Sequence, residues 1–203
     1  MSCAKRDIIL RLAREKGCLR PRDLQAEGIS AAYLQRLYEA GDLVRSGRGI
    51  YGLASHEFSE HRTLVEVAKR VPRAVICLLS ALRYHELGTE TPGRVWIALE
   101  RGMKKPNARD LPLEVVRFTP VGMAEGVSLH MIEGVPVRLT TAARTIVDCF
   151  RYRNKMGLAP ALEALKEGLL AGVPMGELQR LAKLFRMERV MRPYLEALAC
   201  ALR

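Results

Sequence analysis

The most constraining feature of the sequence is a short amphipathic segment that leads directly into two apolar runs around a glycine-bearing turn. It lies at residues 28–53 and reads GISAAYLQRLYEAGDLVRSGRGIYGL. Ser30 can cap a helix here by accepting a hydrogen bond from a backbone N–H one turn further on. The helix should end near Gly41. Leu43–Arg45 and Ile50–Leu53 are then expected to form a hairpin, because SGRG supplies the glycines that tight hairpin turns need.

Two further helices are predicted ahead of this segment. Apolar side chains recur at helical spacing from Lys5 to Lys16, and Gly17 ends the pattern. A second short helix should run from Pro21 to Glu27, since proline is favoured in a first turn. Three helices followed by a two-stranded hairpin is the layout of a winged helix-turn-helix domain. Its third helix can enter a DNA major groove, which is about 12 Å wide.

The helical period divides the third helix into two faces. Ala31, Leu34, Leu37 and Tyr38 share the apolar face. The same rotation turns Ala32, Tyr33 and Arg36 away from the core, with Gln35 on the flank. The predicted DNA-binding residues are Ser30, Ala32, Tyr33, Gln35 and Arg36 at the helix and Arg45, Ser46 and Arg48 in the hairpin. The alternative is a winged helix that makes only protein contacts, with its arginines as solvated surface charge.

The net charge favours an anionic partner. Lysines and arginines number 33 against 22 acidic residues, which gives a formal charge of +11, and such an excess is typical of nucleic-acid-binding proteins. Two further basic groups, one in an expected loop at 101–109 and one spaced every third residue from Arg180, are possible partner or nucleic-acid contacts, with a solvated surface as the default. Their members are Arg101, Lys104, Lys105, Arg180, Lys183, Arg186 and Arg189.

We predict neither a metal site nor a cofactor. The five cysteines are odd in number and form no CxxC pair, and the four histidines form no HExxH motif. These patterns argue against a disulfide framework and a zinc site, and favour a reducing compartment. No stretch reaches the roughly 20 apolar residues of a membrane span, and the N-terminus lacks the apolar block of a signal peptide. We therefore expect a soluble, cytoplasmic protein.

A domain boundary is expected at about residues 54–58, after which the pattern changes. Helices are predicted at 59–71 and 76–87, and runs rich in β-branched residues predict strands at 94–100, 113–118, 127–132 and 135–140. Four helices should follow at 141–153, 158–171, 174–186 and 188–201. The predicted fold class is α+β: a winged helix-turn-helix domain at 1–55, then a mixed domain with a small β-sheet and a helical C-terminal part at 58–203.

Catalytic motifs are not evident in the sequence. It contains no P-loop, GxSxG or GxGxxG, and no glycine-serine turn with paired acids of the kind that nucleotidyl transfer needs to hold Mg²⁺. Asp148 follows Arg144 by four residues, so a helical ion pair explains it better than catalysis. Ser80 and His85 would point about 140° apart on a helix, which argues against a Ser–His dyad. His85 lies in an apolar helical run, so a packed or capping role is favoured over metal binding. The sequence therefore does not indicate an enzyme.

Three blocks in order resemble the AbiEi family of bacterial antitoxins. They read GISAAYLQRLYEAGDLVRSGRGIYGL, LSALRYHELGTETPGRVWIALERG and VRLTTAARTIVDCF, and the resemblance covers about residues 5–170. It implies a winged helix that represses the protein's own promoter by binding operator DNA. It also implies a second domain that counteracts, directly or indirectly, a partner toxin of the nucleotidyltransferase type. The alternative is a stand-alone winged-helix regulator whose second domain binds an effector or a partner protein.

Overall fold

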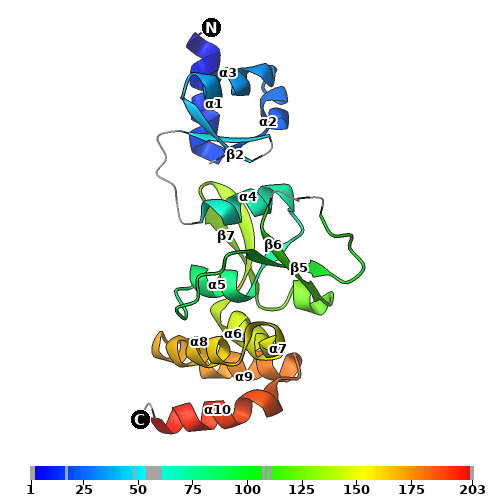
Figure 1. Ribbon diagram of the computed structural model, residues 1–203, viewed down its shortest axis with the longest axis vertical. Helices are drawn as coiled ribbons and strands as arrows, with labels where there is room; N and C mark the ends of the chain where they lie inside the picture. Colours follow the sequence, from blue (N-terminus) through cyan, green and yellow to red (C-terminus); the bar gives the residue numbers. More distant parts are fainter. Residues whose placement is uncertain are drawn as a thin grey trace. The chain divides into compact units, whose positions relative to one another are not determined.

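The computed structural model describes residues 3–16, 18–47, 49–53, 61–106, 108 and 111–201. Contacts within the chain divide it into two compact units (Figure 1). The first unit comprises Met1–Pro72, Ala108–Leu111 and His130–Val137, and the second comprises Arg73–Asn107, Pro112–Leu129 and Arg138–Arg203. The domain limits of 1–55 and 58–203 stay a prediction.

The described residues up to Leu53 form three helices and a small sheet, as the sequence predicts. Strand β3 lies between β1 and β2 and pairs antiparallel with both. The sequence did not predict β1, because a strand of two residues is too short to show an alternation of apolar and polar side chains. The elements are α1 (Cys3–Lys16), β1 (Cys18–Leu19), α2 (Pro21–Gln25), α3 (Ala32–Glu39), β2 (Leu43–Gly47) and β3 (Ile50–Leu53).

A compact apolar core holds these elements together. Ile9 from α1, Leu24 from α2 and Leu37 from α3 are all fully buried in it. At the end of α3, the backbone of Gly41 turns with a φ of +79°, a conformation that glycine adopts without strain. Asp42 then accepts two hydrogen bonds from Arg6, of 2.7 and 2.9 Å, which tie α1 to the start of the hairpin. The orientation of α3 is therefore fixed by the apolar packing and by the bidentate ion pair between Arg6 and Asp42.

A second sheet has five strands in the order β6-β5-β4-β8-β7. Strand β4 is antiparallel to β5 and parallel to β8, while β5 and β6 are parallel along their full length. A two-residue turn joins β7 to β8, and both of its residues, Glu133 and Gly134, have positive φ as hairpin turns require. The elements from here are α4 (Arg62–Arg70), β4 (Val75–Ile76), α5 (Leu78–Tyr84), β5 (Val95–Glu100), β6 (Leu113–Phe118), β7 (Val127–Ile132) and β8 (Val135–Thr140).

The C-terminal part is helical and forms one core with residues of the sheet. Helix α6 lies at its centre, and its residues 143–150 are all buried. Ile146 and Phe150 of α6 belong to the same apolar cluster as Leu165 of α8 and Leu178 of α9. The elements are the 3-10 turn η1 (Val121–Met123), α6 (Ala142–Arg151), α7 (Arg153–Met156), α8 (Ala159–Leu170), α9 (Met175–Leu184) and α10 (Glu188–Ala201).

The chain is thus an α+β protein with an N-terminal helix-turn-helix region, as predicted. All four strands predicted after residue 90 are present within one residue of their expected bounds. The helix predicted at 76–87 is wrong at its start, because Val75 and Ile76 pair with β5 as a strand and the helix begins only at Leu78. The helix predicted at 59–71 is α4, and residues 59 and 60 lie outside the described residues.

Candidate nucleic-acid interface

Helix α3 presents a polar face to solvent, as its sequence predicts. Ala32, Gln35 and Arg36 are exposed, whereas Leu34 and Leu37 are buried. Tyr38 was placed on the apolar face, and this prediction is wrong because 42% of it is exposed. Its ring packs edge-on against Tyr51 of β3, with centroids 6.3 Å apart. Tyr38 therefore covers the side of the core and does not enter it.

Ser30 is exposed but does not cap α3 in the way that was predicted. The helix begins at Ala32, with Ala31 as its N-cap, and the Ser30 hydroxyl accepts a hydrogen bond of 3.4 Å from the N–H only two residues on. The Ser30 carbonyl accepts from Tyr33 N at 3.1 Å, which tightens the chain into a 3-10 turn before the helix. A Ser30 side chain one residue outside the N-cap cannot serve as the cap.

The polar side chains of α3 differ in how far the fold restrains them. The Gln35 amide donates to Glu39 Oε1 at 2.8 Å and accepts from the Tyr51 hydroxyl at 3.4 Å, so it is linked to the hairpin. Arg36 forms no ion pair with any residue that the structure describes, and its guanidinium carbon lies 5.5 Å from the centre of the Tyr33 ring. Arg36 is therefore the cation of α3 that can bind an external acceptor.

The hairpin has the geometry of a wing. Strands β2 and β3 pair from Leu43 with Leu53 to Arg45 with Tyr51, and a bulge follows Arg45. Arg45 is exposed, and Gly49 turns the chain with a φ of +74°. Arg48, predicted at the tip, lies outside the described residues, as does the side chain of Ser46.

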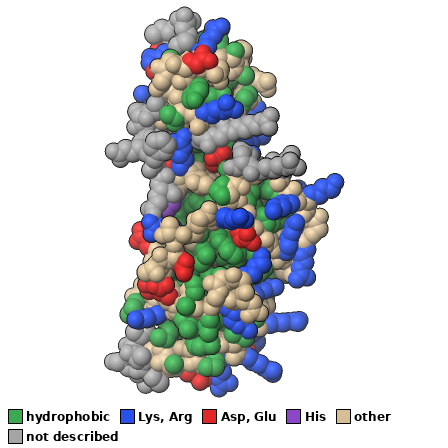
Figure 2. Space-filling model, viewed as in Figure 1, with side chains coloured by type: hydrophobic (Ala, Val, Ile, Leu, Met, Phe, Trp, Pro, Cys, Tyr) green, Lys and Arg blue, Asp and Glu red, His purple; other side chains and the backbone are tan. Residues whose placement is uncertain are grey.

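Other predicted contact residues lie on the second unit. Arg101, Lys104 and Lys105 are exposed in the loop between β5 and β6, as expected. The face in Figure 2 carries many lysine and arginine side chains, several of them along one edge of the molecule. The side chains of Arg101, Lys104 and Lys105 are therefore accessible to a partner.

The cations spaced from Arg180 do not share one helix. Helix α9 ends at Leu184, and Arg186 has a positive φ of 59° in the turn before α10. Arg180 pairs with Glu177 and Glu125 at 2.8 and 3.1 Å. Lys183 lines a groove of about 490 Å³ that Glu188 and other charged residues of α9 and α10 also line. Arg189 is exposed on α10. The groove is of mixed charge rather than a basic stripe.

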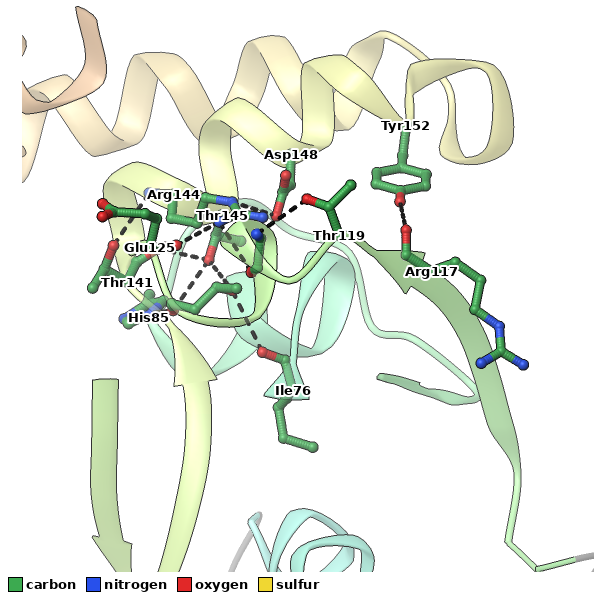
Figure 3. A network of polar contacts seen from close by, with 12 residues as sticks. Ile76, His85, Arg117, Thr119, Glu125, Thr141, Arg144, Thr145, Asp148 and Tyr152 are labelled. Carbon is green, nitrogen blue, oxygen red and sulfur yellow. Dashed lines mark hydrogen bonds and ion pairs between the residues drawn. The ribbon is translucent and has the colours of Figure 1, made fainter. Parts of the chain in front are cut away.

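Arg144 and Asp148 form a fully buried ion pair, shown in Figure 3, in which Arg144 Nε donates to Asp148 Oδ2 at 2.8 Å. Arg144 also donates to the carbonyls of Gly122 and Glu125, and its guanidinium carbon lies 3.7 Å from the centre of the Phe185 ring. Burial raises the pKa of Asp148 to about 6, although Arg144 acts to lower it. The sequence predicted the pair but not its burial. The contacts of Arg144 join α6 to η1, so the ion pair has a structural role.

Two further candidates for catalysis also have structural roles. The Ser80 hydroxyl accepts a hydrogen bond from Trp96 N at 2.9 Å. His85 is the C-cap residue of α5, and its Nε2 lies 2.7 Å from the Thr140 carbonyl (Figure 3). The packed or capping role predicted for His85 is thereby confirmed. Within the part of the chain that the structure describes, no three His, Cys, Asp or Glu side chains are grouped so as to hold a metal ion.

The fold of the first 53 residues defines a helix-turn-helix of the kind found in transcriptional regulators. Residues 7–54 match the family model described as "Transcriptional regulator, AbiEi antitoxin", which confirms the predicted resemblance for this segment. That family is one of regulators and antitoxins and is not an enzyme class. Among the described residues, no helix is both long and apolar enough to cross a membrane.

The fold as a whole is similar to the crystal structure of the Rv2827c protein from Mycobacterium tuberculosis. The TM-score is 0.59 at 17% sequence identity, and the match covers 87% of this chain and 70% of that one. At this identity the likeness concerns the fold alone. No curated protein sequence matches the chain.

Proposed function

We propose that the protein is a DNA-binding antitoxin that represses its own promoter and counteracts a partner nucleotidyltransferase toxin. The observation that carries the DNA-binding part is the exposed face of α3. There Arg36 has no acidic partner among the described residues, and it lies within the segment that matches the AbiEi family model. A net charge of +11 supports an anionic partner.

The operator would be read from two elements. Helix α3 lies in the major groove, where the small side chain of Ala32 lets the backbone come close and Arg36 reaches a base edge. Ser30, Tyr33 and Gln35 border the same face. Arg45, with Ser46 and Arg48, follows the adjacent phosphate backbone or minor groove, a contact that fixes orientation more than sequence preference.

The antitoxin activity belongs to the second domain and rests on the resemblance to the family. Here the protein acts by binding, with no catalytic residue and no cofactor, in the cytoplasm. Exposed cations such as Lys104, Lys105 and Lys183 are the surface that we assign to contact with the toxin or with nucleic acid. Arg101, Arg180, Arg186 and Arg189 extend this surface, with Arg180 partly neutralised by its two glutamates.

The second candidate function is a stand-alone winged-helix regulator whose second domain binds an effector or partner protein. One observation favours it. The match to the antitoxin family model ends at residue 54, so for the second domain the comparisons give only a similarity of fold. The gene next to this one discriminates between the two functions, because only the antitoxin requires a nucleotidyltransferase toxin there.

The proposal is tested by separating the two activities in the full chain. The chain and its Arg36→Ala variant are expressed from an unrelated promoter, beside a reporter driven by the natural promoter and an inducible copy of the neighbouring toxin gene. We expect Arg36→Ala to lose repression and to keep protecting colonies from the toxin. If the wild-type chain does not repress the reporter, the proposed role as a regulator is contradicted. If the wild-type chain does not protect colonies from the toxin, the proposed role as an antitoxin is contradicted.

A further inference from the structure

Two cations from different helices lie beside one tyrosine ring. Lys5 Nζ of α1 and Arg36 Cζ of α3 each lie 5.5 Å from the centre of the Tyr33 ring. Because each group lies 5.5 Å from the same ring centre, Lys5 Nζ and Arg36 Cζ are at most twice 5.5 Å apart. Lys5 is exposed and 28 positions from Tyr33 in the sequence, and helical periodicity within α3 gave no sign of it.

The ring holds this arrangement in place. Tyr33 is half-buried and packs against the core that contains Leu34 and Leu37, so its aromatic face has a fixed position at the surface. A cation over such a face is attracted to the negative charge of the ring, by about 0.5–1 kcal/mol at exposed sites. Tyr33 can thus orient both cations without neutralising either of them.

The two cations have no acidic partner among the described residues. Neither Lys5 nor Arg36 forms an ion pair with any described residue, whereas the adjacent Arg6 is bound to Asp42 through two hydrogen bonds. An anion bound beside the Tyr33 ring would be attracted by both cations. A backbone phosphate of DNA supplies such an anion, and lysine is a common phosphate ligand because it acts as a compact point charge.

We propose that Lys5 and Tyr33 complete the DNA interface, with Lys5 binding a backbone phosphate beside the base pair that Arg36 contacts. Tyr33 is a positioning residue that orients both cations. The inference rests on the proposed function, since it assumes that α3 faces DNA. It extends the interface from α3 and the wing to the N-terminal part of α1.

The test measures how binding by the full chain depends on salt. The probes are a duplex of the region upstream of the chain's own gene and a scrambled duplex of equal length, titrated by fluorescence anisotropy between about 50 and 200 mM salt. Loss of one phosphate contact lowers the slope of log K against log salt by about 0.9. We expect this decrease for Lys5→Ala, with equal loss of affinity on both duplexes, because a phosphate carries no sequence information.

Arg11→Ala is the matched control. It removes the same charge from α1, but the Arg11 side chain is 67% exposed and lies beside Glu15, about 120° around the helix from Lys5. Its slope should equal that of wild type. A slope for Lys5→Ala equal to that of wild type, or a decrease shared by Arg11→Ala, would overturn the phosphate contact.

The role of Tyr33 is tested with three replacements. Tyr33→Phe keeps the ring and should retain more affinity than either of the other two variants. Tyr33→Leu keeps apolar packing without an aromatic face, and Tyr33→Ala removes both. Each of these two should weaken binding, and adding Lys5→Ala to Tyr33→Leu should cost less than Lys5→Ala alone. Thermal unfolding identifies any variant that is not folded. Equal binding by the Phe and Leu variants would overturn the positioning role.

The same data separate this inference from the proposed function. Wild type that shows no preference for the upstream duplex would overturn the proposed function, and the inference with it. Wild type that prefers that duplex, together with an unchanged salt slope for Lys5→Ala, would overturn the inference alone.

Discussion

Replacing Arg144 with methionine should destabilise the protein strongly and change how its stability depends on pH. The change removes the ion pair with Asp148, the bonds to two carbonyls and the contact with the Phe185 ring. Removal of one partner of a buried pair typically costs about 3–5 kcal/mol, because the other charge is left uncompensated. We expect a loss of that size in the free energy of unfolding at pH 7.

The pH dependence follows from the carboxyl that remains. Asp148 titrates near pH 4 in an unfolded chain and at about 6 in the folded protein. Because the folded pKa is the higher one, this group's contribution to stability is fully present below pH 4 and is lost as pH rises to 6. Arg144 lowers the folded pKa, so its removal raises that pKa further. The loss should then continue above pH 6, with a limiting slope of about 1.4 kcal/mol per pH unit.

The assay is urea unfolding followed by circular dichroism between pH 6 and 8. The control is Arg144→Met combined with Asp148→Asn. This variant keeps the shape of the carboxyl without its titration, so comparison with it cancels the contribution of all other groups. The single variant should lose stability with rising pH relative to the double variant. Parallel curves for the two variants would refute the reasoning, because they would mean that no buried carboxyl titrates in this window.

Three further predictions concern the N-terminal unit. Arg36→Ala should weaken binding to the upstream duplex by about 1–3 kcal/mol and blunt base preference, and equal loss on a scrambled duplex in gel-shift titrations would limit Arg36 to phosphate contact. Arg45→Ala should lower the salt slope by about 0.9 with little change in preference; an unchanged slope would remove Arg45 from the interface. Leu37→Ala should cost about 2–5 kcal/mol in the free energy of unfolding, because the side chain is fully buried, and a loss below 1 kcal/mol in urea unfolding would contradict the packing described for α3.

The sequence predicted those helices and strands whose apolar residues recur with a clear helical or strand period. The three N-terminal helices, the wing and the four later strands follow from apolar spacing, glycines and β-branched runs. Short strands such as β1 and β4 have no period of their own, and they exist because a neighbouring strand pairs with them. The apolar face of α3 was correct for Leu34 and Leu37 and wrong for Tyr38, whose environment is set by Tyr51 of the wing.

Contacts between segments distant in sequence could not be predicted. The spacing of Arg144 and Asp148 indicated a pair, but its burial depends on Gly122, Glu125 and Phe185, which only the fold brings to it. The placement of Lys5 beside Tyr33 is of the same kind. The sequence therefore predicted the exposure of Ala32 and Arg36, but it was wrong for Tyr33, which packs against the core and is half-buried. The structure added the contacts that restrain these side chains.

The most direct test of the proposed function is a nuclease footprint of the full chain on the DNA upstream of its own gene. The account predicts one or more discrete protected segments that overlap the promoter, survive an excess of scrambled competitor duplex, and disappear with Arg36→Ala. Uniform protection that the competitor abolishes would contradict a sequence-specific regulator. The absence of any protected segment with folded protein would contradict it as well.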